Sequence, residues 1–147
     1  MSPVRSAVLR IVSALVCCAA FAATPAAADT SATTLGVELN KLEQTEAACR
    51  AYLVFDNRTG TAFDELKLDL VFFGTGGVIS KRMAVGVAPL AADKTSVKLF
   101  DIADLDCAAV GRVLINDVLA CADASGERDD CVGLLRPTSL ADAQFVK

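Results

Sequence analysis

The sequence predicts an all-β domain, an immunoglobulin-like antiparallel sandwich of about seven short strands that disulfides staple together. Apolar and polar residues alternate with a period of two over most of residues 35–135, and turn-forming residues interrupt the pattern at short intervals. Four cysteines lie in the same region. The chain has no tryptophan, so the cysteine-tryptophan-cysteine core of antibody domains is absent, and a small β-barrel is the alternative architecture.

The N-terminal segment has the features of an export signal. Arg5 and Arg10 are the only charged residues in a stretch that continues into the uncharged, mostly apolar run 11–23. This run is too short to cross a bilayer as a helix. The two arginines are not adjacent, which favours general secretion over the twin-arginine route.

Small residues behind the apolar run predict a cleavage site. Ala26 and Ala28 form a small-x-small box, so we expect the mature chain to begin at Asp29. The chain then divides into a signal peptide, 1–28, and one mature domain, 29–147, without a membrane anchor. Cleavage removes 28 of the 147 residues, so the mature part has 119, which is enough for one hydrophobic core and too few for two.

Composition excludes several classes of function. The signal carries two positive charges, so its removal lowers the formal net charge from −4 to −6. A nucleic-acid partner is therefore disfavoured, and a charged partner is expected to be cationic. The chain has no histidine, which excludes serine-histidine and cysteine-histidine catalysis and removes the commonest zinc ligand. We expect no catalytic residue, no metal site and no cofactor.

Strand patterns recur along the mature chain. The predicted strands are 35–40, 48–55, 66–73, 78–87, 95–102, 111–121 and 131–135. The turn 74–77 is expected to join the third and fourth strands as a hairpin. A short helical turn capped by Asp104 or Asp106 is expected within 103–110, and a flexible, acidic loop is expected over 122–130. Pro137 is expected to stop the seventh strand, and the tail beyond it has little to bury except Phe145.

The mature cysteines predict two structural disulfides. They are Cys49, Cys107, Cys121 and Cys131. No Cys-x-x-Cys pair is present, which argues against a redox motif and a structural zinc site. Four cysteines allow three connectivities. We favour Cys121 with Cys131 across the polar loop, which leaves Cys49 to meet Cys107.

Asn116 and Asp117 interrupt an otherwise apolar strand. Asp117 has the same parity as Val113 and Ile115, which predicts an inward-facing carboxylate. An unpaired buried charge costs several kcal/mol. We therefore expect a structural role, either an ion pair with an arginine (Arg50, Arg82 or Arg112) or a β-bulge that turns the side chain outward, rather than acid-base or binding chemistry.

Phe72 and Phe73 must point to opposite faces of one strand. One of them is expected in the core, and the other toward solvent or a partner.

Four segments together resemble a known group of proteins. They read CRAYLVFDNRTG, LKLDLVFFGTGGVISKR, LFDIADLDC and VLINDVLAC. In this order they resemble small secreted proteins of alphaproteobacteria that are often labelled as twin-arginine signal domain proteins. The third strand also resembles extracytoplasmic sandwich domains with a Phe-x-Leu-Tyr-Asp signature, although Phe72-Phe73-Gly74 stands where Leu-Tyr-Asp would. Both resemblances imply a sandwich fold and an accessory role, and neither transfers a site.

These observations favour a non-enzymatic accessory domain of the periplasm or extracellular space. It is expected to bind a protein or an envelope component through a sheet face or the loop 122–130. The alternative is an acidic inhibitor of a basic hydrolase such as a lysozyme, which small size, disulfides and negative charge suggest. A carboxylate hydrolase ranks last, because alternating strands offer no recognisable pair of converging acids.

Overall fold

The computed structural model describes residues 33–147. The predicted signal peptide, and its cleavage between Ala28 and Asp29, lie outside the described residues and stay predictions. Within the described part, none of the helical segments has the length and apolar character that crossing a membrane requires.

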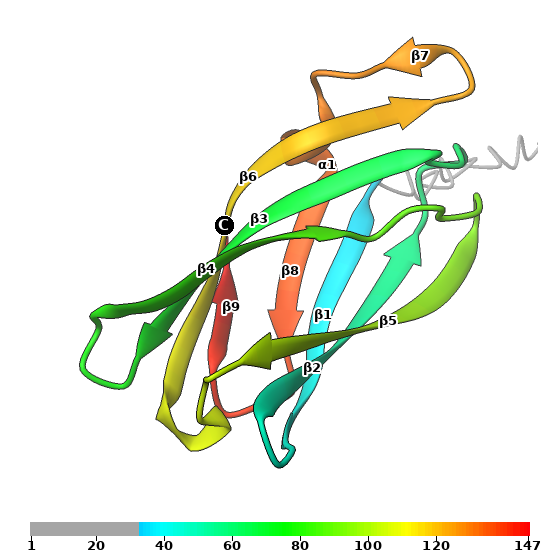
Figure 1. The fold of residues 1–147 in the computed structure, drawn as a ribbon. Coiled ribbons are helices and arrows are strands. Elements are labelled where there is room, and N and C mark those ends of the chain that lie inside the picture. Colours follow the sequence, from blue (N-terminus) through cyan, green and yellow to red (C-terminus); the bar gives the residue numbers. More distant parts are fainter. Residues whose placement is uncertain (1–32) are drawn as a thin grey trace, which may run out of the picture. The chain divides into compact units, whose positions relative to one another are not determined.

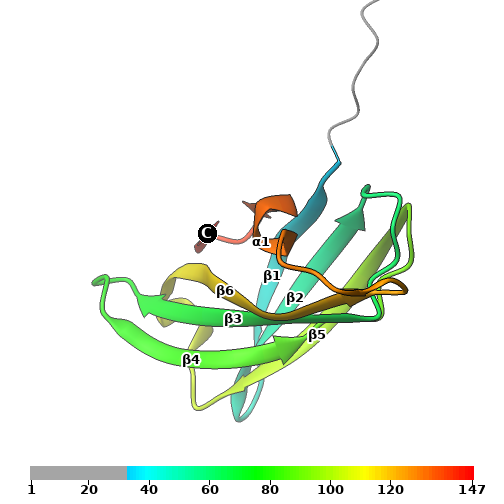
Figure 2. The same ribbon diagram turned by 90° about the horizontal axis from the view of Figure 1, so that it is seen from above.

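The described residues form a sandwich of two β-sheets (Figure 1), as the sequence predicts. The four-stranded sheet has the order β5 (Lys94–Ala103), β2 (Ala48–Asn57), β1 (Leu35–Gln44) and β8 (Leu135–Ser139). The five-stranded sheet contains β4 (Ile79–Gly86), β3 (Glu65–Gly74), β6 (Val110–Asp123), β7 (Gly126–Glu127) and β9 (Gln144–Val146). Seen from above, the strands of the two sheets run in clearly different directions (Figure 2).

The strand order is immunoglobulin-like for five of the first six strands. The connections from β2 to β3, from β4 to β5 and from β5 to β6 all cross from one sheet to the other, whereas β1–β2 and β3–β4 are hairpins within one sheet. The first, second and fifth strands therefore lie in one sheet and the third and sixth in the other, as in constant-type immunoglobulin domains, but the fourth strand lies beside the third instead of beside the fifth. The C-terminal part departs from that plan.

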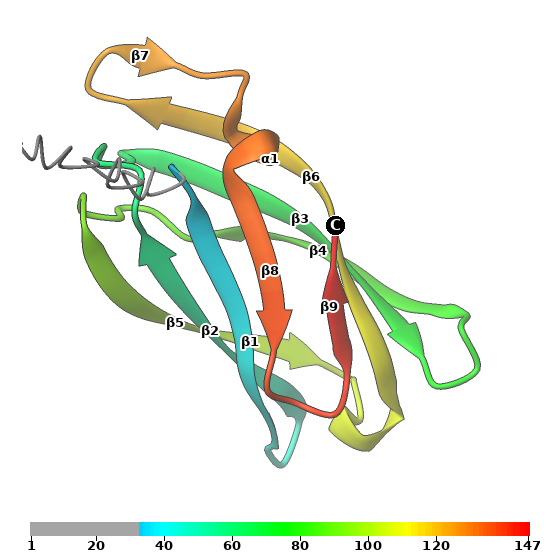
Figure 3. The ribbon, with the colours of Figure 1, turned by 180° about the vertical axis from the view of Figure 1, so that it is seen from behind.

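The C-terminal chain contributes one strand to each sheet. β8 pairs with β1 and β9 pairs with β6, and both pairings are parallel, so the sheets are not purely antiparallel as expected. Figure 3 shows β8 and β9 lying between β1 and β6. The buried Phe145 on β9 belongs to the common core, which explains why the tail is held. With β7 and β9, which the alternation does not predict, the described residues contain nine strands against the seven expected.

The core follows the alternation in the sequence. On β2, Cys49, Ala51, Leu53 and Phe55 are buried, while the residues between them are half-exposed. The same parity places Leu66, Leu68, Leu70 and Phe72 of β3 in the core. The buried polar Asn57 donates to the carbonyl oxygens of Thr61 at 2.8 Å and Ala91 at 2.9 Å, so its burial is compensated.

Two local predictions differ from the structure. Residues Cys131–Leu134, expected as a strand, form a single helical turn, α1, and the strand begins only at Leu135. β8 then runs through Pro137, which was expected to end it. Proline is tolerated there because β8 is an edge strand that pairs only with β1.

Other local predictions are confirmed. The 3-10 turn η1 (Cys107–Ala109) has Asp106 as its N-cap, whose carboxylate accepts the Ala108 N–H at 3.0 Å. β3 and β4 form the expected hairpin around residues 74–77, where Gly77 has φ 80°.

Both predicted disulfides are present. Cys49 of β2 is bonded to Cys107 in η1, and Cys121 of β6 is bonded to Cys131 in α1. The first bridge links the four-stranded sheet to the segment that leads into the five-stranded sheet. Two disulfides in a domain of this size fit an oxidising, extracytoplasmic location.

Candidate binding surfaces

A buried carboxylate lies on the outer face of the five-stranded sheet, and it is Asp69 rather than Asp117. Asp69 is 2% exposed. Its oxygens accept hydrogen bonds from Arg82 Nε and Nη2 at 2.9 and 2.8 Å and from Asn116 Nδ2 at 2.7 Å. Hydrogen bonds from Arg82 hold the pKa of Asp69 below its ordinary value against the opposing effect of burial. The three side chains form a structural network.

The inward orientation expected for Asp117 is wrong. The register changes between the pairs Asp69/Asp117 and Leu70/Ile115, so Asn116 is the extra residue of a β-bulge. The bulge reverses the parity of β6 at this point, and Asp117 is exposed, with its carboxylate accepting the Val118 N–H at 2.8 Å. The alternative expectation, a β-bulge that turns the Asp117 side chain outward, is therefore confirmed.

The far end of the five-stranded sheet is strongly acidic. We call it the acidic end, and it comprises Asp64, Glu65, Asp123, Glu127, Arg128, Asp129 and Asp130. Ala122 of β6 pairs with Glu65 of β3 on one side and with Glu127 of β7 on the other, so these two carboxylates flank it on one face. Figure 1 shows β7 beside the end of β6, on the side away from β3. Six carboxylates and one guanidinium thus gather here.

The acidic end is ordered, although its loop was expected to be flexible. Arg128 Nη1 lies 2.9 Å from Asp123 Oδ2, and Arg128 Nη2 lies 2.7 Å from Asp130 Oδ2. Its guanidinium also lies over the Phe63 ring, 5.7 Å from the centroid. The backbone N–H of Arg128 donates to the backbone carbonyl oxygen of Cys121. Cys121 is itself fixed by its disulfide to Cys131. The hairpin is therefore held in one arrangement.

Two carboxylates of the acidic end, Asp123 and Asp130, have lowered pKa values. The pKa of Asp123 is lowered first by the backbone N–H of Ser125 and then by Arg128, and Arg128 lowers the pKa of Asp130. Four other carboxylates of this end are exposed and make no ion pair with any residue in 33–147: Asp64, Glu65, Glu127 and Asp129. Their negative charges face solvent and are not neutralised by an ion pair among the described residues.

The outer face of the four-stranded sheet carries a short apolar strip. Opposite each other on β2 and β5 lie Tyr52 and Leu99, then Val54 and Val97. Leu99 is 50% exposed and Val97 55% exposed. An ion pair between Arg50 and Asp101, with 2.6 Å between Nε and Oδ1, closes one end of the strip and lowers the pKa of Asp101. This strip is the second surface suited to contact with a partner.

The structure separates the two adjacent phenylalanines as expected. Phe72 is buried in the core, and Phe73 is half-exposed on the outer face, where the Arg112 guanidinium covers its ring.

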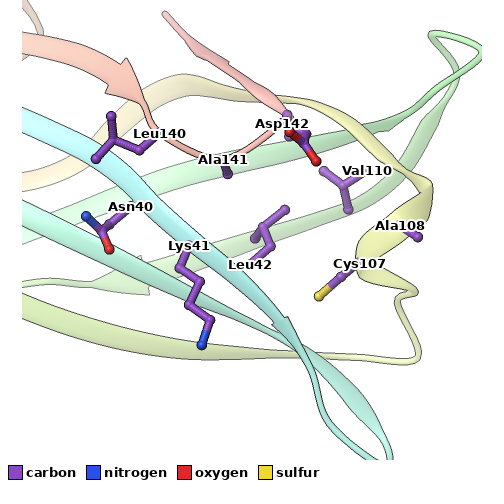
Figure 4. A pocket seen from close by; sticks show the side chains of 10 residues that line it. Asn40, Lys41, Leu42, Cys107, Ala108, Val110, Leu140, Ala141 and Asp142 are labelled. Atoms are coloured by element: carbon purple, nitrogen blue, oxygen red, sulfur yellow. The ribbon is translucent and has the colours of Figure 1, made fainter.

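A hollow of about 390 Å³ lies between β1, η1 and the turn that joins β8 to β9 (Figure 4). It has two charged side chains. Lys41 is already paired with Glu43 at 3.3 Å and lies over the Tyr52 ring, and Asp142 makes no ion pair with any described residue. The disulfide-bonded Cys107 also lines it, so it offers no free thiol. Nothing in this hollow combines a nucleophile with a base.

Within residues 33–147, no group of three or more acidic or cysteine side chains is placed to hold a metal ion. The chain matches no protein family model, no curated protein and no solved structure. The resemblance to small secreted alphaproteobacterial proteins therefore stays a prediction.

Proposed function

We propose that the mature chain is an exported, non-enzymatic binding domain that docks a cationic protein or envelope component on its acidic end. The observation that carries this proposal is a set of four exposed carboxylates that make no ion pair among residues 33–147. Glu127 and Asp129 lie on the hairpin that Arg128 and a disulfide hold in place, and Asp64 and Glu65 lie beside it at the start of β3. Opposite charge on a partner accelerates encounter and orients docking. A pre-ordered hairpin loses little conformational entropy when it binds.

Export to the periplasm or extracellular space is part of the same proposal. It is supported by the charged, apolar and small-residue regions of the predicted signal and by the two disulfides. Intact mass of the exported protein tests it. A chain that begins at Asp29 is expected, and a chain that retains Met1 or carries a lipid on Cys18 contradicts it.

The docking proposal is tested with two variants of equal charge change. The acidic-end variant carries Asp64→Asn, Glu65→Gln, Glu127→Gln and Asp129→Asn. The control carries Glu46→Gln, Asp93→Asn, Asp104→Asn and Asp117→Asn, all exposed positions elsewhere. Asp93 and Asp104 have positive φ, which asparagine also adopts readily.

Each protein is immobilised, and periplasmic or extracellular extract is passed over it at low salt. A component that the wild type and the control retain, and that the acidic-end variant loses by about tenfold or more, supports the proposal. Equal retention by all three proteins refutes docking at this end. A partner lost only on substitution of Leu99 by lysine would place docking on the apolar strip instead.

A second candidate is an acidic inhibitor of a basic hydrolase. The ion pair of Arg128 with Asp123 and the disulfide fix the hairpin. This favours an inhibitor, because tight inhibitors bind with surfaces that change little on association. Lysis of bacterial cells by a basic lysozyme is the discriminating assay. Inhibition by the wild type and the control, but not by the acidic-end variant, favours the inhibitor. An unchanged lysis rate with a retained envelope component favours the accessory role.

A further inference from the structure

Arg112 lies on the outer face of the five-stranded sheet, far along β6 from the acidic end. It pairs in register with Phe73 of β3 on one side and with Gln144 of β9 on the other. Its guanidinium carbon lies 4.2 Å from the centroid of the Phe73 ring, so the cation stacks on an aromatic face. This stacking leaves the N–H groups in the guanidinium plane to point sideways along the sheet surface.

The hydrogen-bonding capacity of Arg112 is unused in the described chain. Its Nε is buried and has no partner. None of the hydrogen bonds or ion pairs among residues 33–147 involves the rest of its guanidinium. Every other arginine in this part of the chain donates to a carboxylate or a carbonyl oxygen. Because Nε is closed off from solvent, an acceptor from outside the chain can reach only the two terminal nitrogens, which remain open and carry four unpaired N–H donors.

The unpaired guanidinium lines an open hollow of about 310 Å³. The hairpin turn from Gly74 to Gly77 forms one wall, and Asp142 and Gln144 form another. Asp142 makes no ion pair with Arg112 or with any other described residue. The hollow therefore presents one cation and one anion that form no ion pair with each other.

We propose that this hollow binds a small zwitterion of the amino-acid type, with its carboxylate on Arg112 and its ammonium group on Asp142. The in-plane fork of a guanidinium fits a planar carboxylate through two parallel hydrogen bonds. The Gln144 amide stands beside Arg112 and supplies a further donor. Asp142 disfavours phosphate and other ligands of purely negative charge, and it attracts the ammonium group of the zwitterion.

This site is independent of the proposed docking at the acidic end. The two share no residue, and the site concerns a small zwitterion rather than a cationic surface. Failure of one proposal therefore leaves the other unaffected.

The test is titration of the ¹⁵N-labelled mature domain with glycine, followed by amide chemical shifts. Acetate and methylammonium serve as ligands that carry only one of the two charges. The proposal expects saturable shifts with glycine at the 74–77 turn, Gly111 and Gln144, and binding of acetate or methylammonium at least tenfold weaker. Shifts that grow linearly without saturation, or acetate that binds as well as glycine, overturn it.

Substitutions test which side chain binds the carboxylate of the ligand and which binds its ammonium group. Arg112→Gln and Asp142→Asn are each expected to weaken glycine binding at least tenfold, while Arg58→Gln and Asp104→Asn, at exposed positions elsewhere, leave it unchanged. Arg112→Lys keeps the charge and loses the fork, so it is expected to restore part of the affinity. Glycine binding that survives both site substitutions, or an Arg112–Asp142 ion pair in the free domain, refutes the site.

Discussion

Oδ2 of Asp69 lies 2.8 Å from Nη2 of Arg82, and this ion pair joins β3 to β4 although only its anionic half is buried. The side chain of Asp69 is 3% exposed and that of Arg82 is 63% exposed. The carboxylate therefore depends on its partners for the solvation that water would otherwise give. Asn116, the bulge residue of β6, supplies the remaining hydrogen bond.

Asp69→Asn is expected to lower the free energy of unfolding by about 1–3 kcal/mol, because the buried network loses its negative charge and one of its two acceptor oxygens, and the new amide N–H groups face the donors of Arg82 and Asn116. Asp117→Asn is the matched control. It lies directly opposite Asp69 in the register but is exposed, so a change below about 0.5 kcal/mol is expected. Urea unfolding of both variants measures the difference. Equal losses would mean that burial of Asp69 does not matter.

The same pair predicts a dependence of stability on pH. Arg82 holds the folded-state pKa of Asp69 below its ordinary value of 3.8. The pair's contribution is therefore fully present above that value and is lost as the pH falls through the lowered folded-state pKa. The gap in unfolding free energy between the wild type and Asp69→Asn should be widest near about pH 7 and shrink toward about pH 2. A gap that stays constant over this range would contradict the linkage.

The sequence predicts the strands of this domain better than it predicts their polar contacts. Alternation identifies β3 because Leu66, Leu68 and Leu70 are separated by polar or outward-facing residues. It fails at α1, because Cys131–Leu134 is too short to show a period. It also fails at Asp117, because a bulge shifts parity by one residue and leaves no trace in composition.

A signal for Asp69 was nevertheless present. The predicted hairpin at 74–77 brings the third and fourth strands together, and Arg82 then falls near Asp69 on the same face. The acidic end had no such signal. Glu65 and Glu127 lie on either side of Ala122 only because β3 and β7 both pair with β6, and pairing between strands distant in sequence is not readable from local patterns.

Removal of the two disulfides is expected to have unequal effects on stability. Cys49 and Cys107 are 58 positions apart, and Cys121 and Cys131 are 10 apart. Loop-closure entropy then predicts losses of about 4 and about 3 kcal/mol for the paired alanine variants. Loss of both approaches the whole stability of a typical small domain.

Urea unfolding of the two paired variants measures these losses, with non-reducing peptide mapping to verify the remaining bridge. A larger loss from the Cys121–Cys131 pair would show that local packing at the acidic end, rather than loop entropy, sets its contribution.

Gly111 is expected to be irreplaceable at the start of β6, since the β3–β4 turn packs directly against it. A Cβ added at Gly111 would lie 3.0 Å from the Thr75 Cα and 3.1 Å from the Gly74 oxygen, and both are backbone atoms. They can move only if the turn shifts, so Gly111→Ala should cost about 1–3 kcal/mol in unfolding free energy. Gly76→Ala in the same turn is the control, because an added Cβ there meets nothing within 4 Å. Thermal and urea unfolding compare the two variants. A Gly111→Ala protein as stable as the Gly76→Ala protein would show that the turn is free to move away from β6, and the hollow around Arg112 would then lose one of its walls.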